Sequence, residues 1–217
     1  MGTFREMESD TVKKKIILAS ASPRRRELLA QIGAEFEVRV SDKEEIYRSH
    51  RPEEIVKELA LMKAENVAAD LAEETRAAGA ENSELRNIIV IGADTVVVLD
   101  GQILGKPKDE EDAADMLSRL QGRVHEVYTG TAILDYDEEG RRSVVNQAVR
   151  TEVHVHAMEE AEIRRYIATG EPMDKAGAYG IQGRFAAFID RIEGDYYNVV
   201  GLPVSSMYQE LKKAGAL

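Results

Sequence analysis

The 217-residue sequence contains no cysteine and no tryptophan, and only 5 of its residues are proline. Without cysteine the chain can form neither a disulfide framework nor a thiolate metal site, and it is compatible with a reducing compartment. Long hydrophobic runs are also missing, because the longest apolar stretch, IIVIGADTVVVL, contains Asp94 and is too short to span a bilayer. The first residues, MGTFREMESDTVKKK, lack the apolar segment of a secretory signal. We therefore expect a cytoplasmic protein that makes no contact with a membrane.

Positive charge is scarce as well. The chain has 29 Lys and Arg residues against 40 Asp and Glu residues, which gives a formal net charge of −11. An acidic surface repels the phosphate backbone of nucleic acids, so we expect no nucleic-acid partner. Against this background a compact basic cluster, Arg24 to Arg26, is informative, because it can bind a small polyanion.

The basic cluster lies in the stretch SASPRRRELLAQIG, which predicts a helix. Ser22 is a suitable N-cap, Pro23 suits the first helical position, and Gly33 can close the C-terminal end. The three arginines fall in the first turn, where the positive end of the helix dipole makes each cation unfavourable by roughly 0.3–1 kcal/mol. This arrangement calls for a compensating interaction.

Two interpretations of the arginine cluster remain open at this stage. In the first, the arginines are solvated on an exposed helix face, where such charges matter little. In the second, they bind phosphate together with the hydroxyls of Ser20 and Ser22, since arginine binds phosphate oxygens in a bidentate manner. Arg26 then faces solvent. Replacing Arg24 and Arg25 with alanine is expected to weaken phosphate binding and to leave the fold intact or slightly more stable.

The hydrophobic periodicity predicts an α/β fold with a mixed sheet flanked by helices. From the chain length we expect one domain over residues 16–217, in two lobes around a cleft, after a charged tail of residues 1–15. Strands are expected in KKIILAS, FEVRV, both halves of IIVIGADTVVVL, the hairpin 124–156 and the stretch after DKAGAYGIQG. Helices are expected after Ser22, from Pro52, in KDEEDAADMLSRLQG, in EEAEIRRYIATG and in LPVSSMYQELKKAG. The two halves of IIVIGADTVVVL are expected to be separated by a break at residues 92–94, and residues 72–87 to form a helix end and a surface loop.

Five charged side chains are individually ambiguous. Asp94 is either a turn or capping aspartate or a carboxylate whose apolar setting calls for a metal ion, a lysine or a reacting water as its partner. Lys106 is a candidate for that partner or for a phosphate ligand. Lys63 lies on the apolar stripe of its helix, where most lysines only cover apolar surface with their stems. Glu44 and Glu45 are typical loop charges.

The histidines do not form a convincing metal site. His154 and His156 share one face of a predicted strand, but no third ligand is evident, so an ordinary strand is the preferred interpretation. The sequence also lacks a Walker A loop, a G-x-G-x-x-G motif and a G-x-S-x-G elbow. P-loop, Rossmann and α/β-hydrolase functions therefore have no support.

Three motifs in order, LASASPRRRELL, GADTVVVLDGQILGKP and DKAGAYGIQG, resemble the Maf family of septum-formation-inhibitor-like nucleoside triphosphate pyrophosphatases. The resemblance implies an α/β fold like that of inosine-triphosphate pyrophosphatases. It also implies cleavage of a nucleoside triphosphate between its α- and β-phosphates with a divalent cation, Mg²⁺ or Mn²⁺. The third motif is similar to that of the branch acting on dTTP and UTP, so these nucleotides or modified pyrimidine nucleotides are the implied substrates.

The same resemblance assigns roles to individual residues. Asp94 matches the proton acceptor of the family, and Asp94 and Glu45 are the implied metal ligands. The positions implied in substrate binding and specificity are Ser20, Arg24, Arg25, Glu45, Lys63, Thr95, Lys106 and Gln182. Among these, Arg24, Thr95 and Gln182 are implied in the choice of substrate.

Other functions remain as alternatives. One is a 7-methyl-GTP-type pyrophosphatase, and another is a non-catalytic, nucleotide-binding regulator of cell division. A phosphatase with an aspartate nucleophile is a third, although Asp94 is followed by Thr95 and a valine run rather than by the second acid such a site generally has. A homodimer is also left open.

Overall fold

The computed structural model describes residues 13–78 and 85–217. Most of the charged tail expected over residues 1–15 lies outside the described residues, as does the part of the expected loop between residues 79 and 84. Among the helices of the described chain, none combines the length and the apolar character that a bilayer crossing requires.

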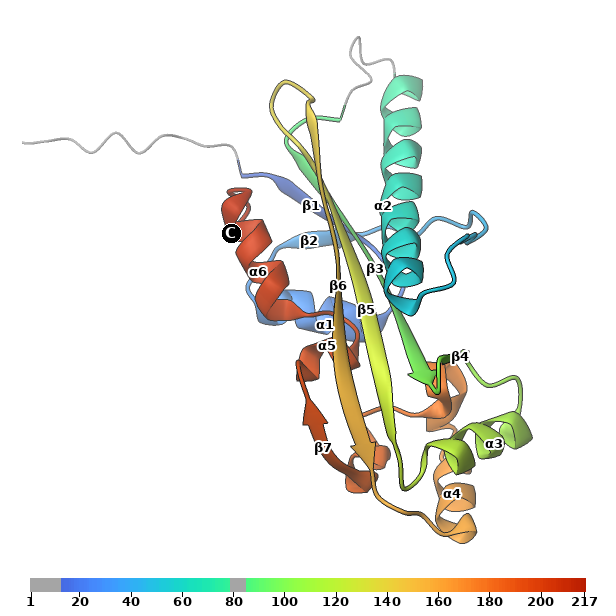
Figure 1. The fold of residues 1–217 in the computed structure, drawn as a ribbon. Coiled ribbons are helices and arrows are strands. Elements are labelled where there is room, and N and C mark those ends of the chain that lie inside the picture. Colours follow the sequence, from blue (N-terminus) through green and yellow to red (C-terminus); the bar gives the residue numbers. More distant parts are fainter. Residues whose placement is uncertain (1–12, 79–84) are drawn as a thin grey trace, which may run out of the picture.

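The centre of the molecule is one seven-stranded mixed sheet, which confirms the expected fold class (Figure 1). Its strands are β1 Lys15–Ala19, β2 Phe36–Val38, β3 Ile88–Leu99, β4 Gln102–Leu104, β5 Val124–Tyr136, β6 Arg142–Val155 and β7 Ile189–Glu193. The order is β2-β1-β3-β5-β6-β7, and β4 pairs with β3. β1 runs parallel to β2 and β3, whereas all other pairs are antiparallel.

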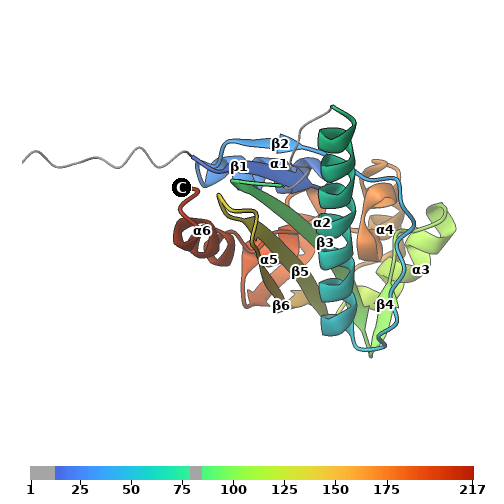
Figure 2. The same cartoon turned by 90° about the horizontal axis from the view of Figure 1, so that it is seen from above.

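Helices cover both faces of this sheet. They are α1 Pro23–Gln31, α2 Pro52–Ala77, α3 Glu110–Leu120, α4 Glu160–Ile167, α5 Tyr196–Val200 and α6 Val204–Lys213, with short 3-10 segments at η1 Glu171–Asp174, η2 Ala176–Ala178 and η3 Arg184–Phe188. The long helix α2 lies alone on one face of β3 and β5, and α1, α5 and α6 lie on the other (Figure 2). The larger hydrophobic core lies on the side of α1, α5 and α6 and continues to α3 and α4.

Local signals account for many of the element boundaries. The Asp109 side chain caps α3 by accepting a hydrogen bond from the Asp112 N–H at 2.8 Å. Asp100 and Gly101, with φ values of 50° and 75°, form the turn between β3 and β4. Each of these boundaries depends on the preferences of one or two residues.

The break expected at residues 92–94 is wrong, because β3 is continuous. It pairs with β5 from Ile88 opposite Tyr136 to Val98 opposite Glu126. Gly92 instead allows α2 to approach the sheet: a Cβ atom at this position would lie 2.0 Å from the Ala60 carbonyl oxygen. The glycine therefore marks close helix packing, not a strand end.

The site is positioned by an open edge of β3. β1 ends at Ala19, opposite Gly92, and β4 pairs only from Val97 onward. In the described chain, no strand pairs with residues 93–96 along this edge. Since successive strand residues point to opposite faces, Asp94 faces α2, while Thr95 faces α1 and α5.

Candidate active site

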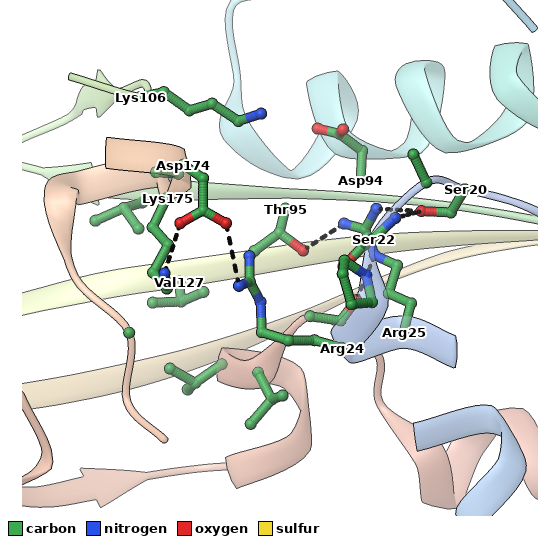
Figure 3. Close-up of a pocket in the computed structure, with 18 of the residues that line it drawn as sticks. Ser20, Ser22, Arg24, Arg25, Asp94, Thr95, Lys106, Val127, Asp174 and Lys175 are labelled. Carbon is green, nitrogen blue, oxygen red and sulfur yellow. Dashed lines mark hydrogen bonds and ion pairs between the residues drawn. The ribbon is translucent and has the colours of Figure 1, made fainter. Parts of the chain in front are cut away.

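A cavity of about 790 Å³ lies at the open edge of β3. Its walls come from the end of β1, the start of α1, the segment 40–45, α2, and the segment 171–183 (Figure 3). All the site residues expected from the sequence line it: Ser20, Arg24, Arg25, Glu45, Lys63, Asp94, Thr95, Lys106 and Gln182. Arg26 is exposed outside the lining, as expected, and Glu44 is outside it as well.

The N-terminus of α1 points into this cavity. Ser22 is the N-cap residue and Pro23 follows it, as the sequence predicts, but the Ser22 side chain makes no capping hydrogen bond. The first-turn N–H groups therefore have no side-chain cap, and the positive end of the helix faces the cavity. Such an end favours an anion.

Arg25 is held by three acceptors, two of which come from distant parts of the chain. Its Nε donates to the Gly201 carbonyl at 2.8 Å, Nη1 to Ser20 Oγ at 3.1 Å and Nη2 to Thr95 Oγ1 at 3.0 Å. Burial lowers the pKa of this guanidinium from its ordinary value, and the charge of Asp94 opposes the shift. Two of its five N–H donors remain for other acceptors. Arg25 is thus part of the local structure as well as a possible anion ligand.

Asp94 and Glu45 share one cation. Lys63 Nζ lies 2.5 Å from Asp94 Oδ1 and 3.2 Å from Glu45 Oε1. Asp94 and Lys63 are mostly buried, with side-chain exposures of 15% and 21%. Their separation from solvent strengthens this ion pair relative to the surface pairs of the molecule.

The carboxylates of Asp94 and Glu45 are the hard oxygen donors that divalent cations such as Mg²⁺ prefer. They converge on a position that already holds a cationic group, the Lys63 ammonium, so the donor set fits a cation. Within the described residues, a group of three His, Asp or Glu ligand atoms occurs elsewhere, at Glu152, His154 and Glu193. His154 Nε2 lies 3.0 Å from Glu193 Oε1 in this group, and His156 is not part of it.

Several lining residues were not assigned from the sequence. Lys175 Nζ, mostly buried, donates to the Glu171 carbonyl at 2.6 Å and to Asp174 Oδ1 at 2.5 Å, and Asp174 Oδ2 is 3.6 Å from Arg24 Nη1 (Figure 3). Burial raises the pKa of Asp174, but the hydrogen bond and charge of Lys175 outweigh burial, so the net shift is downward. Lys175 belongs to the motif DKAGAYGIQG. A lysine directly before a glycine-rich loop is the sequence feature from which its place in the site could have been predicted.

Gln182 and Lys106 reach the cavity from its outer side, and both side chains are exposed. The loop that carries Gln182 is fixed by Glu171, whose Oε2 accepts a hydrogen bond from the Arg184 N–H at 3.0 Å. A Cβ atom on Gly183 would lie 2.0 Å from Glu171 Oε1, so glycine lets the loop backbone approach this carboxylate.

Comparison with known proteins agrees with the motifs. A family model described as Maf-like protein matches residues 15–214. A dTTP/UTP pyrophosphatase of Agathobacter rectalis is 54% identical over 204 residues, which cover 93% of this chain and 98% of the relative. A protein of the same name from Dictyoglomus turgidum is 50% identical over 206 residues, 94% of this chain and 98% of the relative. Among solved structures, the Ham1 protein of Staphylococcus aureus aligns with a TM-score of 0.48 and 16% identity, over 92% of this chain and 99% of that one.

Proposed function

The chain belongs to the Maf family, and from this premise we propose that it is a nucleoside triphosphate pyrophosphatase. It hydrolyses dTTP and UTP to the nucleoside monophosphate and pyrophosphate, the activity for which its relatives are named. A cytoplasmic location, where nucleotide pools are found, is part of the same proposal. The homodimer left open by the sequence stays a prediction.

One observation supports the proposal most strongly: the site residues expected from the sequence, which are far apart along the chain, all line one cavity. Four of them are cations, Arg24, Arg25, Lys63 and Lys106, and Lys43 and Lys175 also line the cavity. A triphosphate carries several negative charges, so distributed cations bind it and neutralise the charge that develops as the anhydride bond breaks. The uncapped N-terminus of α1 adds N–H donors for a phosphate.

Asp94 is the carboxylate that we assign to the reacting water. Its position beside Lys63 places a negative charge next to the cations that hold the phosphates. A carboxylate there can orient a water molecule for in-line attack on phosphorus and accept its proton. Lys63, in contact with Asp94 and Glu45, is within reach of a phosphate oxygen bound at the same place.

Asp94 and Glu45 would hold the divalent cation, Mg²⁺ or Mn²⁺, together with oxygens of the triphosphate. Mg²⁺ is commonly bound in this way, through one or two carboxylates and the substrate phosphates. When bound, such a cation supplies charge neutralisation on the phosphate oxygens. Lys63 contacts one oxygen of each carboxylate, Asp94 Oδ1 and Glu45 Oε1, so the second oxygens would be available to the cation.

Product analysis tests this function. The purified protein is incubated with dTTP or UTP and MgCl₂, and the released pyrophosphate and orthophosphate are quantified separately. We expect pyrophosphate and the monophosphate in equal amounts. Orthophosphate as the main product would support a phosphatase, activity confined to 7-methyl-GTP would support the other family branch, and nucleotide binding without any product would support a regulator.

A further inference from the structure

A tight turn at residues 180–183 carries Gln182 to the cavity. The Gly183 N–H donates to the Gly180 carbonyl at 3.1 Å, which closes a four-residue turn with Ile181 and Gln182 at its two central positions. Ile181 is buried and Gln182 is exposed, and both line the cavity. In the part of the chain that the structure describes, no group hydrogen-bonds the Gln182 amide. The position of this amide therefore depends on the turn.

One carboxylate, that of Glu171, holds the turn at both ends. After the turn, the Arg184 N–H donates to Glu171 Oε2 at 3.0 Å. Before the turn, the Gly180 N–H donates to the Tyr166 hydroxyl at 3.2 Å, and this hydroxyl donates to Glu171 Oε1 at 2.9 Å. Burial raises the pKa of Tyr166, so the hydroxyl keeps the proton that it donates. Each oxygen of the carboxylate thus serves one end of the turn.

The two glycines of the turn lie directly against the side chains below it. A Cβ atom on Gly183 would lie 2.0 Å from Glu171 Oε1, and a Cβ atom on Gly180 would lie 2.7 Å from Lys175 Cε. Lys175 is itself tied to Glu171, whose carbonyl accepts a hydrogen bond from Lys175 Nζ at 2.6 Å. The backbone of the turn is therefore seated on Glu171 and Lys175 as well as hydrogen-bonded at its ends.

Tyr166 takes part in this arrangement from outside the cavity. It lies in the last turn of α4, is buried with an exposure of 4%, and does not line the cavity. Its ring packs against Phe185, with 5.2 Å between the ring centroids. Its hydroxyl can therefore influence a bound nucleotide through Glu171 and the turn, and not by direct contact.

We propose that Glu171 and Tyr166 are positioning residues, which fix the Gln182 amide against the base of the bound nucleotide. The inference rests on the proposed function and deepens it, because Gln182 is among the residues implied in the choice of substrate. A side-chain amide both donates and accepts, so it can pair with a base edge when it is correctly placed. Holding the turn at both ends reduces the ordering that nucleotide binding would otherwise require.

A double-mutant cycle tests whether Tyr166 acts through Gln182. The kcat/KM for pyrophosphate release from UTP is measured for the unaltered protein, Tyr166→Phe, Gln182→Ala and the double variant. We expect each single change to lower kcat/KM about tenfold through a higher KM, the size of one hydrogen bond. The double variant should be no poorer than Gln182→Ala, because the two residues act as one unit. Tyr208→Phe, at an exposed tyrosine on α6 outside the lining, is the matched control and should keep the normal value.

Three results of this cycle would overturn the inference. They are losses that multiply in the double variant, a normal kcat/KM in Tyr166→Phe, and a normal kcat/KM in Gln182→Ala. A merely structural role of Tyr166 would give the first of these. Absence of pyrophosphate from every nucleotide with the unaltered protein would instead overturn the proposed function.

A second test measures the turn itself and does not depend on turnover. Glu171→Gln keeps the size of the side chain but offers one acceptor oxygen in place of two, so one end of the turn loses its partner. We expect the amide proton of Gly180, of Arg184 or of both to exchange with solvent faster. The amide proton of Gly201, which donates to the Tyr197 carbonyl at 3.0 Å, is the internal control and should keep its exchange rate.

The same variant separates the base from the phosphates. In calorimetric titrations without divalent metal, Glu171→Gln should bind dTTP about tenfold more weakly, whereas its affinity for inorganic tripolyphosphate, which has no base, should be unchanged. Normal exchange at both Gly180 and Arg184, or equal weakening of dTTP and tripolyphosphate, would contradict the positioning role. If Tyr166→Phe does not fold, these measurements on Glu171→Gln decide.

Discussion

Arg24 and Arg25 are neighbours in the sequence, yet their side chains have different surroundings. Arg25 makes three hydrogen bonds, to Ser20, Thr95 and the Gly201 carbonyl. Arg24 is about one-third exposed, at 32%, and its ion pair with Asp174 is long, at 3.6 Å. From the sequence, both charges are unfavourable at the positive end of the helix dipole, so removing either is expected to leave stability unchanged or slightly higher. The structure changes this expectation for Arg25, because its three hydrogen bonds offset the unfavourable interaction with the dipole.

The two arginines should therefore differ in their effect on stability. Arg25→Ala leaves buried acceptors without a charged donor, so we expect the free energy of unfolding to fall by about 2 kcal/mol. Arg24→Ala, the matched control, should change it by less than about 0.5 kcal/mol. Urea unfolding of both variants measures the difference, and calorimetric titration with dTTP should show weaker binding for each. An Arg25→Ala variant as stable as Arg24→Ala would contradict the structural role of Arg25.

At the scale of elements, the packing of α2 on the sheet determines where Lys63 lies. Gly92 on β3 and Gly130 on β5 face the helix backbone, and a Cβ atom on Gly130 would lie 2.1 Å from the Val56 carbonyl oxygen. Small residues on α2, among them Ala60, complete this contact. The close approach of α2 brings Lys63 to within 2.5 Å of Asp94.

Gly92→Ala should therefore destabilise the protein, although replacing glycine with alanine in a strand is usually favourable. The added methyl group forces the helix away from β3, and overpacking of this kind costs about 1–3 kcal/mol. Gly105→Ala is the control, because a Cβ atom there has nothing within 4 Å and no positive φ opposes it. The two variants are compared by urea unfolding. Equal stabilities would show that the contact between α2 and β3 is not as tight as described.

At the scale of the whole molecule, the chain has a net negative charge, whereas a group of positively charged side chains lines the cavity. The chain carries a formal net charge of −11, yet Arg24, Arg25, Lys63, Lys106 and Lys175 gather in one place. This distribution suits a small anion such as a nucleoside triphosphate and disfavours long polyanions. The fold produces it by placing the open edge of β3 between the start of α1 and the segment 171–183.

Much of this arrangement could be predicted from the sequence, because some signals are local. The Asp109 cap, the Asp100–Gly101 turn and the start of α2 at Pro52 each depend on the preferences of one or two residues. The site residues expected from the sequence also converge, Gln182 included.

The features that were missed depend on tertiary contacts. Gly92 reads as a strand break in the sequence, and only the backbone of α2 explains it. α5, Tyr196–Val200, is too short for a helical period to be recognised. Thr129 and Asn198 carry no local sequence signal, because they are 69 residues apart in the chain and come into contact only in the folded structure.

The central claim is that this cavity hydrolyses pyrimidine nucleoside triphosphates with Asp94 at the reacting water, and Asp94→Asn tests it most directly. The variant keeps the shape of the side chain but loses its negative charge. Pyrophosphate release from dTTP with MgCl₂ is measured beside the unaltered protein and Glu44→Gln, which removes a neighbouring charge outside the lining. We predict that Asp94→Asn remains folded and binds dTTP but turns it over about 10²–10⁴-fold more slowly, while Glu44→Gln keeps the normal rate. A folded Asp94→Asn variant with near-normal kcat would contradict the account.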